Sequence, residues 1–274
     1  MQPLIDADVL VYECGFAAET AWKGENHGID VDAFPPPFDR VADLLDNRIA
    51  NTCAIVDATM PPILFLTGKT NFRYGLAKRQ PYKDGRGKKP YHYKNVLAYI
   101  KGKYDYRLTE GLEADDLMAI EQTKATDQTI ICTRDKDLRQ VAGWHYGWEL
   151  GNQPQFGPLY VEAPGRITLS ANRKKVEGYG PLFFFSQCLT GDRVDSIPGL
   201  EGCGPVKAYQ ILEGSKTEEE AFKSVLAAYK VAFGDRAEEE LLEQGRLLHM
   251  TRGLNEDGSP ILWELPMIEG IGGA

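Results

Sequence analysis

The stretch EADDLMAIEQTKATDQTIICTRD, residues 113–135, decides the fold because it joins an acidic helix start to a buried strand. Its first part places carboxylates directly ahead of an apolar run of helical periodicity that extends to about Lys124. Its last part, QTIICTRD (128–135), is the kind of short apolar run that forms a buried strand. A helix followed by a buried strand is typical of an α/β protein with a mostly parallel sheet.

The acidic start of this helix has two readings. Acids suit the first turn of a helix, where the helix dipole is positive, and a single acid would need no other explanation. Glu113, Asp115 and Asp116 crowd three like charges into four positions, which also fits a bound cation. The helix alone leaves both readings open.

Other runs continue the same rhythm of strand and helix. PLIDADVLVY (3–12) and PILFLTG (62–68) predict strands, and FDRVADLLDNRIANTCAIV (38–56) between them has helical spacing. Residues 104–111 predict a short strand, 144–178 short strands or loops, and 180–192 a buried helix. From about residue 195 the pattern is helical to about 252, with a glycine-rich turn at 199–204, and ILWEL (261–265) predicts a last strand.

Composition excludes several classes of protein. The 274 residues contain no run of about 18 apolar residues, so no membrane span is expected. The start MQPLIDADVLVYECG has no basic lead, and we do not expect a signal peptide. Five scattered cysteines without a CxxC pair indicate reduced thiols in a cytoplasm. The four histidines stand far apart, which gives little support to a zinc site or a histidine-based triad.

Charge is distributed unevenly along the chain. The net charge of −9 alone argues against a nucleic-acid partner. The segment 69–107, however, holds twelve Lys or Arg against Asp84 and Asp105, so it carries +10 and the remainder −19. A basic segment on an acidic body indicates a local anion-binding element, although a solvated charged face would have the same composition.

Acidic groups recur at four comparable positions. They are Asp6 with Asp8, Glu113 with Asp115 and Asp116, Asp135 with Asp137, and Asp192 with Asp195, which are three apart and would share one face if helical. Ligands of open α/β sheets bind beyond the carboxyl ends of the strands, so these acids have a plausible common meeting point. Magnesium prefers oxygen ligands, and two such ions about 4 Å apart can hold both the attacking and the leaving oxygen of a phosphate ester. Taken singly, Asp135 also fits a helix cap, Asp192 a turn and Asp8 an exposed acid.

The basic segment interleaves cations with aromatic rings. Cations neutralise phosphates and aromatic faces stack on unpaired bases, so the pattern suits a nucleic acid. Lys83 and Arg86 are three residues apart and could face the same phosphate. The predicted DNA contacts here are Arg73, Lys78, Arg79, Tyr82, Lys88 and Lys89. In the other reading the tyrosines lie in the core and the lysines are solvated.

A second predicted DNA contact is the glycine-rich turn in IPGLEGCGPVKAYQIL (197–212). Gly202 and Gly204 let the backbone approach a ligand closely, and the helix expected from Pro205 offers free N–H groups to a phosphate. With Lys207, this element is interpreted as a helix-hairpin-helix that grips a DNA backbone without reading bases. A tight helix–helix turn with no ligand is the alternative.

Taken together, these motifs resemble a known family. LIDAD, YKDGR, EADD, TRDKD and LTGDRVDSIPGLEGCGPVKA occur in the order seen in the flap-endonuclease family of 5′-nucleases. The spacing and the tail EQGRLLHMTRGLNEDGSPILWEL look most like the 5′→3′ exonuclease of short-tailed bacteriophages. The resemblance covers most of the chain, with gaps at 13–60 and 143–180.

The resemblance implies a PIN-like α/β fold, with a central, mostly parallel sheet flanked by helices. It implies a catalytic core at 1–180 that includes the basic gateway 69–107, and a helix-hairpin-helix region with C-terminal helices at 181–274. Two magnesium ions, replaceable by manganese, would be bound: the first by Asp6, Glu113, Asp115 and Asp116, the second by Asp135, Asp137 and Asp192, with Asp195 in support. Lys83 and Arg86 would be the catalytic cations, and a potassium ion could lie at the turn 199–204.

The implied function is metal-dependent 5′→3′ exonuclease activity with flap-endonuclease character, in replication or primer removal. The expected partner is duplex DNA with a 5′ end or flap, or an RNA–DNA hybrid, bound by a monomer in the cytoplasm, which would be the host's for a phage protein. One departure is that Thr67 and Gly68 stand where the family commonly has an aspartate after the second strand. Two alternatives therefore stay open: a DNA-binding structural protein with weakened catalysis, and a PIN-like ribonuclease.

Overall fold

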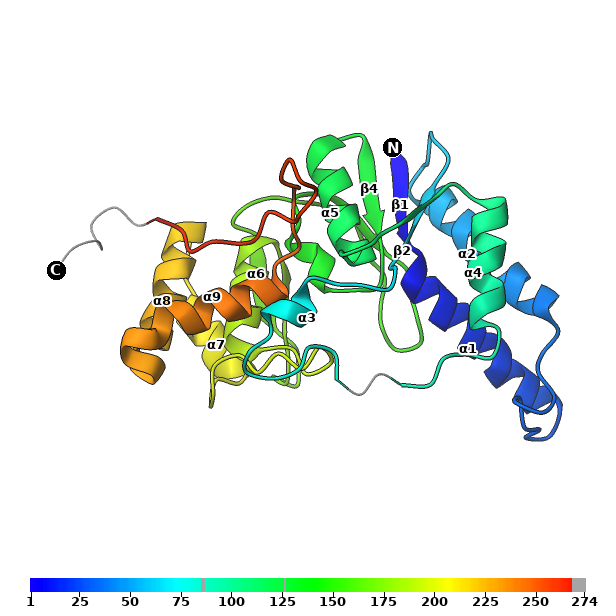
Figure 1. Cartoon of the computed structure of the whole chain (residues 1–274), viewed down its shortest axis with the longest axis horizontal. Coiled ribbons are helices and arrows are strands. Elements are labelled where there is room, and N and C mark those ends of the chain that lie inside the picture. Colours follow the sequence, from blue (N-terminus) through cyan, green and yellow to red (C-terminus); the bar gives the residue numbers. More distant parts are fainter. Residues whose placement is uncertain (85–86, 126, 268–274) are drawn as a thin grey trace. The chain divides into compact units, whose positions relative to one another are not determined.

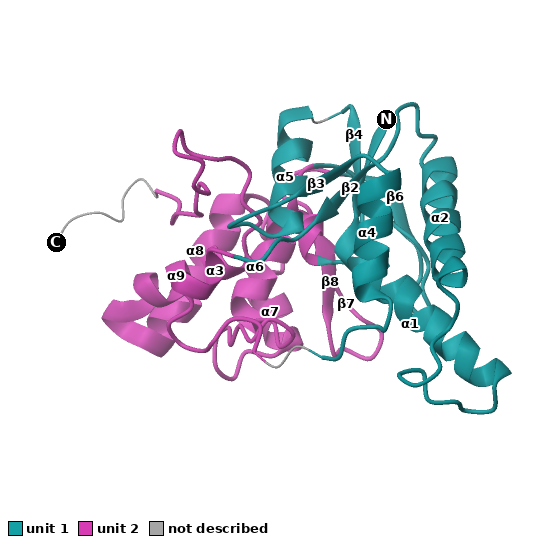
Figure 2. Cartoon of the chain, turned by 45° about the vertical axis from the view of Figure 1, so that its right-hand side comes forward, with its two compact units in different colours: residues 1–70, 86–136, 143–160 teal, residues 71–85, 137–142, 161–274 magenta. Residues whose placement is uncertain are grey.

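The computed structural model describes residues 1–84, 87–125 and 127–267. Within them the chain forms two compact units, shown in different colours in Figure 2. Unit 1 comprises residues 1–70, 86–136 and 143–160, and unit 2 comprises residues 71–85, 137–142 and 161–274. Each unit is therefore assembled from three separate segments of the sequence. No helix among the described residues is long and apolar enough to cross a membrane.

A six-stranded sheet forms the centre of unit 1 (Figure 1). Its strands are β1 (Gln2–Asp6), β2 (Ile63–Leu66), β3 (Tyr106–Leu108), β4 (Thr129–Cys132), β5 (Gly143–Gly147) and β6 (Phe156–Val161), in the order β3-β2-β1-β4-β5-β6. The pairs β1–β2, β1–β4, β2–β3 and β4–β5 are all parallel. The predicted α/β class with a mostly parallel central sheet is thus confirmed.

Both faces of this sheet are covered by helices. They are α1 (Ala7–Glu25), α2 (Phe38–Ile55), α4 (Tyr93–Lys103) and α5 (Ala114–Ala125). Ile5, Leu64 and Ile130 share one core with α1, α2 and α4. Their strand neighbours point to the opposite face, where α5 packs on β1, β2 and β4. Burial on both faces explains why these strands are uninterrupted apolar runs.

The first strand is shorter than predicted. It ends at Asp6, and Ala7 begins a helix that continues to Glu25, so Asp8 lies in a helix rather than in the strand. Asp6 Oδ1 accepts a hydrogen bond from the Val9 N–H at 3.1 Å, which caps the helix start. The apolar residues after it are buried at helical spacing, and such a run does not distinguish a buried helix from a buried strand.

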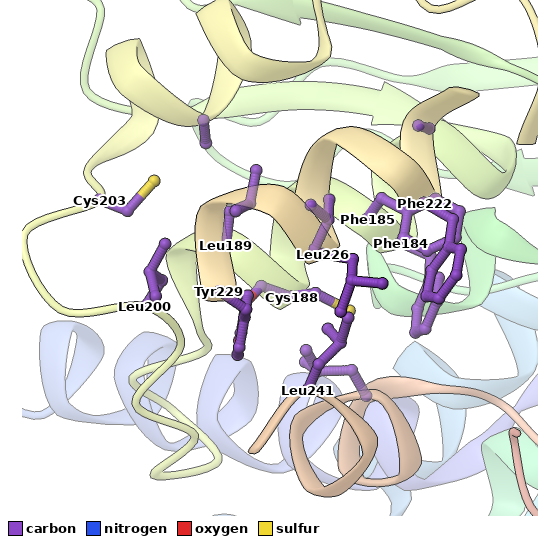
Figure 3. Close-up of a cluster of buried hydrophobic side chains, with 14 of the residues drawn as sticks. Phe184, Phe185, Cys188, Leu189, Leu200, Cys203, Phe222, Leu226, Tyr229 and Leu241 are labelled. Carbon is purple, nitrogen blue, oxygen red and sulfur yellow. The ribbon is translucent and has the colours of Figure 1, made fainter. Parts of the chain in front are cut away.

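Unit 2 is mainly helical. Its elements are the short α3 (Arg73–Leu76), the 3₁₀ turn η1 (Asp137–Gln140), the antiparallel hairpin β7 (Arg166–Leu169) and β8 (Val176–Tyr179), α6 (Gly180–Thr190), α7 (Pro205–Leu212), α8 (Glu218–Phe233), the 3₁₀ turn η2 (Gly234–Arg236) and α9 (Ala237–Leu248). The predicted buried helix is α6, which is enclosed nearly all round. Figure 3 shows Phe185 and Cys188 of α6 among side chains of α8 and α9, including Phe222, Tyr229 and Leu241.

Asp192 and Asp195 lie in a turn after α6 rather than in a helix, and Asp192 Oδ1 accepts from the Val194 N–H at 2.8 Å to close that turn. One prediction about unit 2 is wrong. Residues 261–265 form no strand. Their apolar character serves packing instead, since Trp263 lies against Phe184 and Phe222, and a Cβ at Gly245 would meet its ring at 2.2 Å.

The core of unit 2 gives a stability prediction. Phe185 is fully buried, so Phe185→Ala removes apolar contacts and leaves a cavity, and should lower the free energy of unfolding by about 3–5 kcal/mol. Val231 on α8 is 89% exposed, and Val231→Ala should change it by about 0.5 kcal/mol or less. Urea unfolding followed by circular dichroism measures both. Equal losses for the two variants would contradict the assignment of α6 to the core.

A second prediction concerns acid stability. Burial, together with the nearby Arg252 and Arg73 charges, lowers the pKa of His249 to about 3. Between pH 6.5 and 3 the unfolded chain binds a proton at this histidine that the folded chain does not, so stability should fall as pH falls through this window. His249→Phe keeps an aromatic ring beside Phe184 and removes that proton. Between pH 6.5 and 5, urea titrations should show wild type losing about 1–2 kcal/mol more than the variant.

Candidate functional site

The carboxyl ends of β1, β2 and β4 form one edge of the sheet in unit 1. The three strands are neighbours and run parallel, so they end on the same side. Asp6 is the last residue of β1, Thr67 follows β2 and Thr133 follows β4. This edge is where open α/β sheets bind ligands.

Asp6 is the buried centre of this edge. Its Oδ2 accepts a hydrogen bond from Thr133 Oγ1 at 2.7 Å, while Oδ1 caps α1. Burial, and secondly repulsion from Asp8, raise the pKa of Asp6 to about 6 against the opposing effect of these hydrogen bonds. The ionised carboxylate is therefore costly in the protein alone, and a nearby cation would relieve that cost. This environment fits a hard divalent ion.

Asp8 reaches the neighbouring strand end from the first turn of α1. The Thr67 N–H lies 3.1 Å from Asp8 Oδ2 and 3.3 Å from Oδ1. Thr67 Oγ1 in turn accepts from the Ala114 N–H, the first of α5, at 2.9 Å. One threonine thus connects the acidic turn after β1 to the acidic start of α5.

The acids at the start of α5 combine a structural role with the predicted one. Asp116 Oδ2 accepts from the Glu113 N–H at 3.1 Å and so closes the first turn. Glu113 and Asp116 are both buried, whereas Asp115 is half-buried. After β4, the Asp135 N–H donates to Thr133 Oγ1 at 2.9 Å, which ties the start of its loop to the hydroxyl that binds Asp6.

The remaining acids belong to unit 2. Asp137 Oδ1 accepts from Gln187 Nε2 at 2.5 Å. Asp192 Oδ1 closes the turn that carries Asp195. The predicted second set of ligands is therefore divided, with Asp135 in unit 1 and Asp137, Asp192 and Asp195 in unit 2. Within the described residues, no three His, Cys, Asp or Glu side chains form a ready-made metal group.

Two predicted DNA contacts are buried in unit 2 and need correction. Arg73 is 0% exposed, and its guanidinium donates to the carbonyls of Leu247 and His249, both at 2.9 Å. Tyr82 is buried, and its hydroxyl donates to Asp195 Oδ2 at 3.2 Å. A side chain enclosed in this way cannot reach a phosphate or a base, so the structure gives both a structural role.

The other cations of the same stretch in unit 2 lie close to acids. Arg79 lies 3.5 Å from Glu240 and donates to the Gly199 carbonyl at 3.1 Å, and the exposed Lys78 pairs with Glu239. Lys83 Nζ lies 3.7 Å from Asp195 Oδ1. Arg86 lies outside the described residues.

Lys83 also has an unusual backbone conformation. Its φ is +53°, in the left-handed region that side chains other than glycine rarely adopt. Its N–H donates to the Asp195 carbonyl at 3.0 Å, which holds this conformation. Strained backbone of this kind occurs often at functional sites.

The far end of the basic segment belongs to unit 1. Lys88 pairs with Asp32, and Lys89 Nζ lies 4.1 Å from the centre of the Tyr93 ring. The Tyr91 N–H donates to Glu19 at 2.6 Å. Contacts of this kind leave Lys88 and Lys89 exposed for a further partner.

The glycines of the turn before α7 fall into two kinds. Gly199 is needed for packing, since a Cβ there would meet the Gly191 nitrogen at 2.3 Å. A Cβ at Gly202 or Gly204 would meet nothing within 4 Å, and Lys207 is exposed. Gly202 and Gly204 are therefore exposed, as the helix-hairpin-helix interpretation requires, whereas Cys203 between them is buried and its N–H donates to the Leu200 carbonyl at 3.0 Å. The interpretation itself stays a prediction.

The sequence interpretation missed the two threonines that organise the edge of the sheet. Thr67 and Thr133 each follow an apolar strand directly and each hydrogen-bonds one acid of the turn after β1. A hydroxyl residue at the carboxyl end of a strand was the signal that could have found them. Gly68, the neighbouring candidate for a lost carboxylate, has no room for any side chain, because a Cβ there would meet the Thr109 carbonyl at 1.9 Å.

Comparison with known sequences finds relatives, although no protein-family model matches the chain. DNA polymerase I of Chloroflexus aurantiacus is 29% identical over 201 residues, which are 70% of this chain and 20% of that protein. Flap endonuclease Xni of Shewanella denitrificans is 30% identical over 154 residues, 53% of this chain and 56% of that protein. The chain thus spans about a fifth of the length of the polymerase and about half that of Xni.

Comparison with solved structures confirms the fold. The T5 D15 protein, co-crystallised with metal ions, matches with a TM-score of 0.53 at 14% identity, over 90% of this chain and 99% of that chain. The catalytic core of Rad2 in complex with DNA substrate matches with a TM-score of 0.50 at 14% identity, over 97% and 83%.

The similarity to flap endonuclease Xni in sequence and to T5 D15 and the Rad2 core in fold agrees with the order of acidic motifs along the chain. Of these motifs, LIDAD ends β1 and TRDKD follows β4, which are neighbouring parallel strands of unit 1, while EADD begins α5. The chain is thus similar to flap endonuclease Xni over part of its sequence and shares the fold of T5 D15 and the Rad2 core.

Proposed function

We propose that the protein is a metal-dependent 5′→3′ exodeoxyribonuclease with flap-endonuclease character. The observation that carries this proposal is the acidic edge of the sheet in unit 1. There the Thr133 hydroxyl donates to Asp6 and accepts from the Asp135 N–H, and the Thr67 N–H donates to Asp8 while its hydroxyl accepts from the first N–H of α5. Acids brought together at the carboxyl ends of parallel strands repel one another, and a bound cation would offset that repulsion.

Magnesium is the ion that fits these groups best. Carboxylate oxygens are its preferred ligands, and the raised pKa of Asp6 reflects a negative charge that a divalent ion would stabilise. Asp6, Glu113, Asp115 and Asp116 would hold the first ion, and Asp135, Asp137, Asp192 and Asp195 a second. When bound, such ions supply Lewis-acid stabilisation of the charge that gathers on the phosphate and activate water as the nucleophile.

The chain's own cations would bind and orient the substrate. Lys83 and Arg86 would neutralise charge on the phosphate undergoing hydrolysis. Lys78, Arg79, Lys88 and Lys89 would contact the backbone near the 5′ end. The accessible backbone at Gly202 and Gly204, with Lys207, would hold the duplex through its phosphates, and the carbonyls of the same turn are the place for a potassium ion.

The substrate and setting follow from the same features. Relatives named as flap endonucleases and a structural neighbour solved with DNA substrate support DNA with a 5′ end or flap. We infer a role in replication or primer removal, in which an RNA–DNA hybrid would also be processed. Five free cysteines support a reducing cytoplasm. We also propose that the protein acts as a monomer.

The strand end after β2 favours a second candidate function. Thr67 and Gly68 place no carboxylate there, so a DNA-binding structural protein with weakened catalysis is the alternative. Tight binding of flap DNA without cleavage in Mg²⁺ or Mn²⁺ would favour it. A ribonuclease of the same sheet would instead cleave RNA in preference to DNA.

The first prediction of this function concerns metal dependence. A 5′-labelled duplex and a flap substrate should be degraded in Mg²⁺ and left intact in EDTA, because hydrolysis requires the divalent ion. Asp135→Asn should lower the rate by about 10²-fold or more while leaving binding of the flap within about threefold. A radiolabelled gel assay and fluorescence anisotropy measure the two quantities.

An exposed acid outside the candidate site is the control for this test. Asp257, exposed in a turn of unit 2 and bonded to Ser259, offers a matched carboxylate, and Asp257→Asn should leave the rate unchanged. Equal product in Mg²⁺ and EDTA would sink the metal-dependent mechanism.

The second prediction separates stability from function at Asp6. Its raised pKa means that the ionised form opposes folding at pH 7, so Asp6→Asn should stabilise the metal-free protein by about 1–3 kcal/mol. The amide oxygen can still accept from the Val9 N–H. The same variant should lose nuclease activity. Urea unfolding in EDTA measures the first effect, and a loss of stability in the variant would contradict the account of Asp6.

A further inference from the structure

Asp8 is an acid at the candidate site that lies outside the set of metal ligands implied by the sequence resemblance. It lies in the first turn of α1, but its carboxylate is at the end of another element, bonded to the Thr67 N–H that follows β2. It is half-buried and repels Asp6. The carboxylate therefore stands beside a strand end that supplies none of its own.

The local chain explains why an acid reaches this place from α1. Gly68 has no space for a side chain, since a Cβ would meet the Thr109 carbonyl at 1.9 Å and the Glu110 carboxylate at 2.8 Å. The Thr67 hydroxyl is used to accept from the Ala114 N–H at 2.9 Å. Neither residue after β2 therefore offers a carboxylate of its own. Glu110 lies against Gly68 and accepts from the Thr70 hydroxyl, whereas Asp8 of α1 accepts from the Thr67 N–H directly at the strand end.

We propose that Asp8 completes the first divalent-ion site, and that its carboxylate supplies at the end of β2 the negative charge that Thr67 and Gly68 lack. This proposal rests on the proposed function, because it names a further residue of the same site. Thr67 is then a positioning residue: its N–H orients the Asp8 carboxylate, and its hydroxyl fixes the start of α5 with Glu113.

A simpler role for Asp8 predicts different behaviour. Acids in the first turn of a helix are stabilised by the helix dipole, and Asp39 holds the same place in α2. Asp39 is exposed and bonds the N–H of its own neighbour, Arg40, at 2.8 Å. If the dipole were the whole explanation, neutralising Asp8 or Asp39 would have equal effects on ion binding.

The test measures ion binding directly, with Mn²⁺ as the probe. Isothermal titration of the full chain gives the dissociation constant, and the rise of the melting temperature with Mn²⁺ gives a second readout. Asp8→Asn keeps an oxygen for the Thr67 N–H but loses the charge, and should weaken Mn²⁺ binding about tenfold or more. Asp39→Asn is the matched control and should bind Mn²⁺ as wild type does.

A compensating variant tests the position of the charge. Thr67→Asp in the Asp8→Asn background returns a carboxylate to the end of β2, and its oxygen can still accept from the Ala114 N–H. This double variant should regain most of the lost Mn²⁺ affinity. Melting in EDTA checks that each variant is folded before it is titrated.

The outcomes distinguish this inference from the proposed function. If wild type binds Mn²⁺ and Asp8→Asn binds it equally well, the role of Asp8 is refuted while the metal-dependent function stands. If Asp8→Asn is weakened and the double variant does not recover, the assignment of the charge to the end of β2 is overturned. If wild type shows neither Mn²⁺ binding nor Mn²⁺-dependent stabilisation, the proposed function fails and this inference fails with it.

Discussion

The Asp6 carboxylate is the group on which the rest of the site depends. It ends the central strand of the sheet, caps α1 and accepts the hydroxyl of Thr133. Because it is buried among apolar strands and close to a second acid, its charge is unfavourable in the protein alone. An amide at this place would avoid that cost, and the proposed cation site gives a reason for a carboxylate here.

Much of the fold follows from the pattern of apolar residues. β2, β4 and α6 are recognisable because their apolar runs have lengths that suit one element only. The end of β1 is not recognisable in that way, since VLVY (9–12) suits a buried helix and a buried strand equally. The informative residue there is Asp6 itself, whose side chain can cap a helix. The strand expected around Trp263 is absent for a related reason, because apolar residues beside helices can pack against the core without pairing with another strand.

The sequence indicates where the acids of the candidate edge lie better than it indicates where the cations lie. Parallel strands carry their terminal acids to one edge, and that rule needs only the order of elements. A basic residue gives no such information, because Arg73 bonds main-chain carbonyls in the interior and Lys88 pairs with a surface acid. Several charges of the basic segment are balanced in this way by acids elsewhere in the chain. Exposed pairs such as Lys78–Glu239 contribute little stability, so a phosphate could replace the acid at small cost.

The interleaving of the two units has a consequence for how such a protein can be shortened or inherited. The chain passes from one unit to the other five times, so no single cut yields either unit as a continuous polypeptide. A truncated gene would encode parts of two incomplete cores rather than one intact lobe. We therefore expect this region to be duplicated, fused or lost as a whole during evolution. We also expect two separately expressed halves of the chain to complement each other poorly.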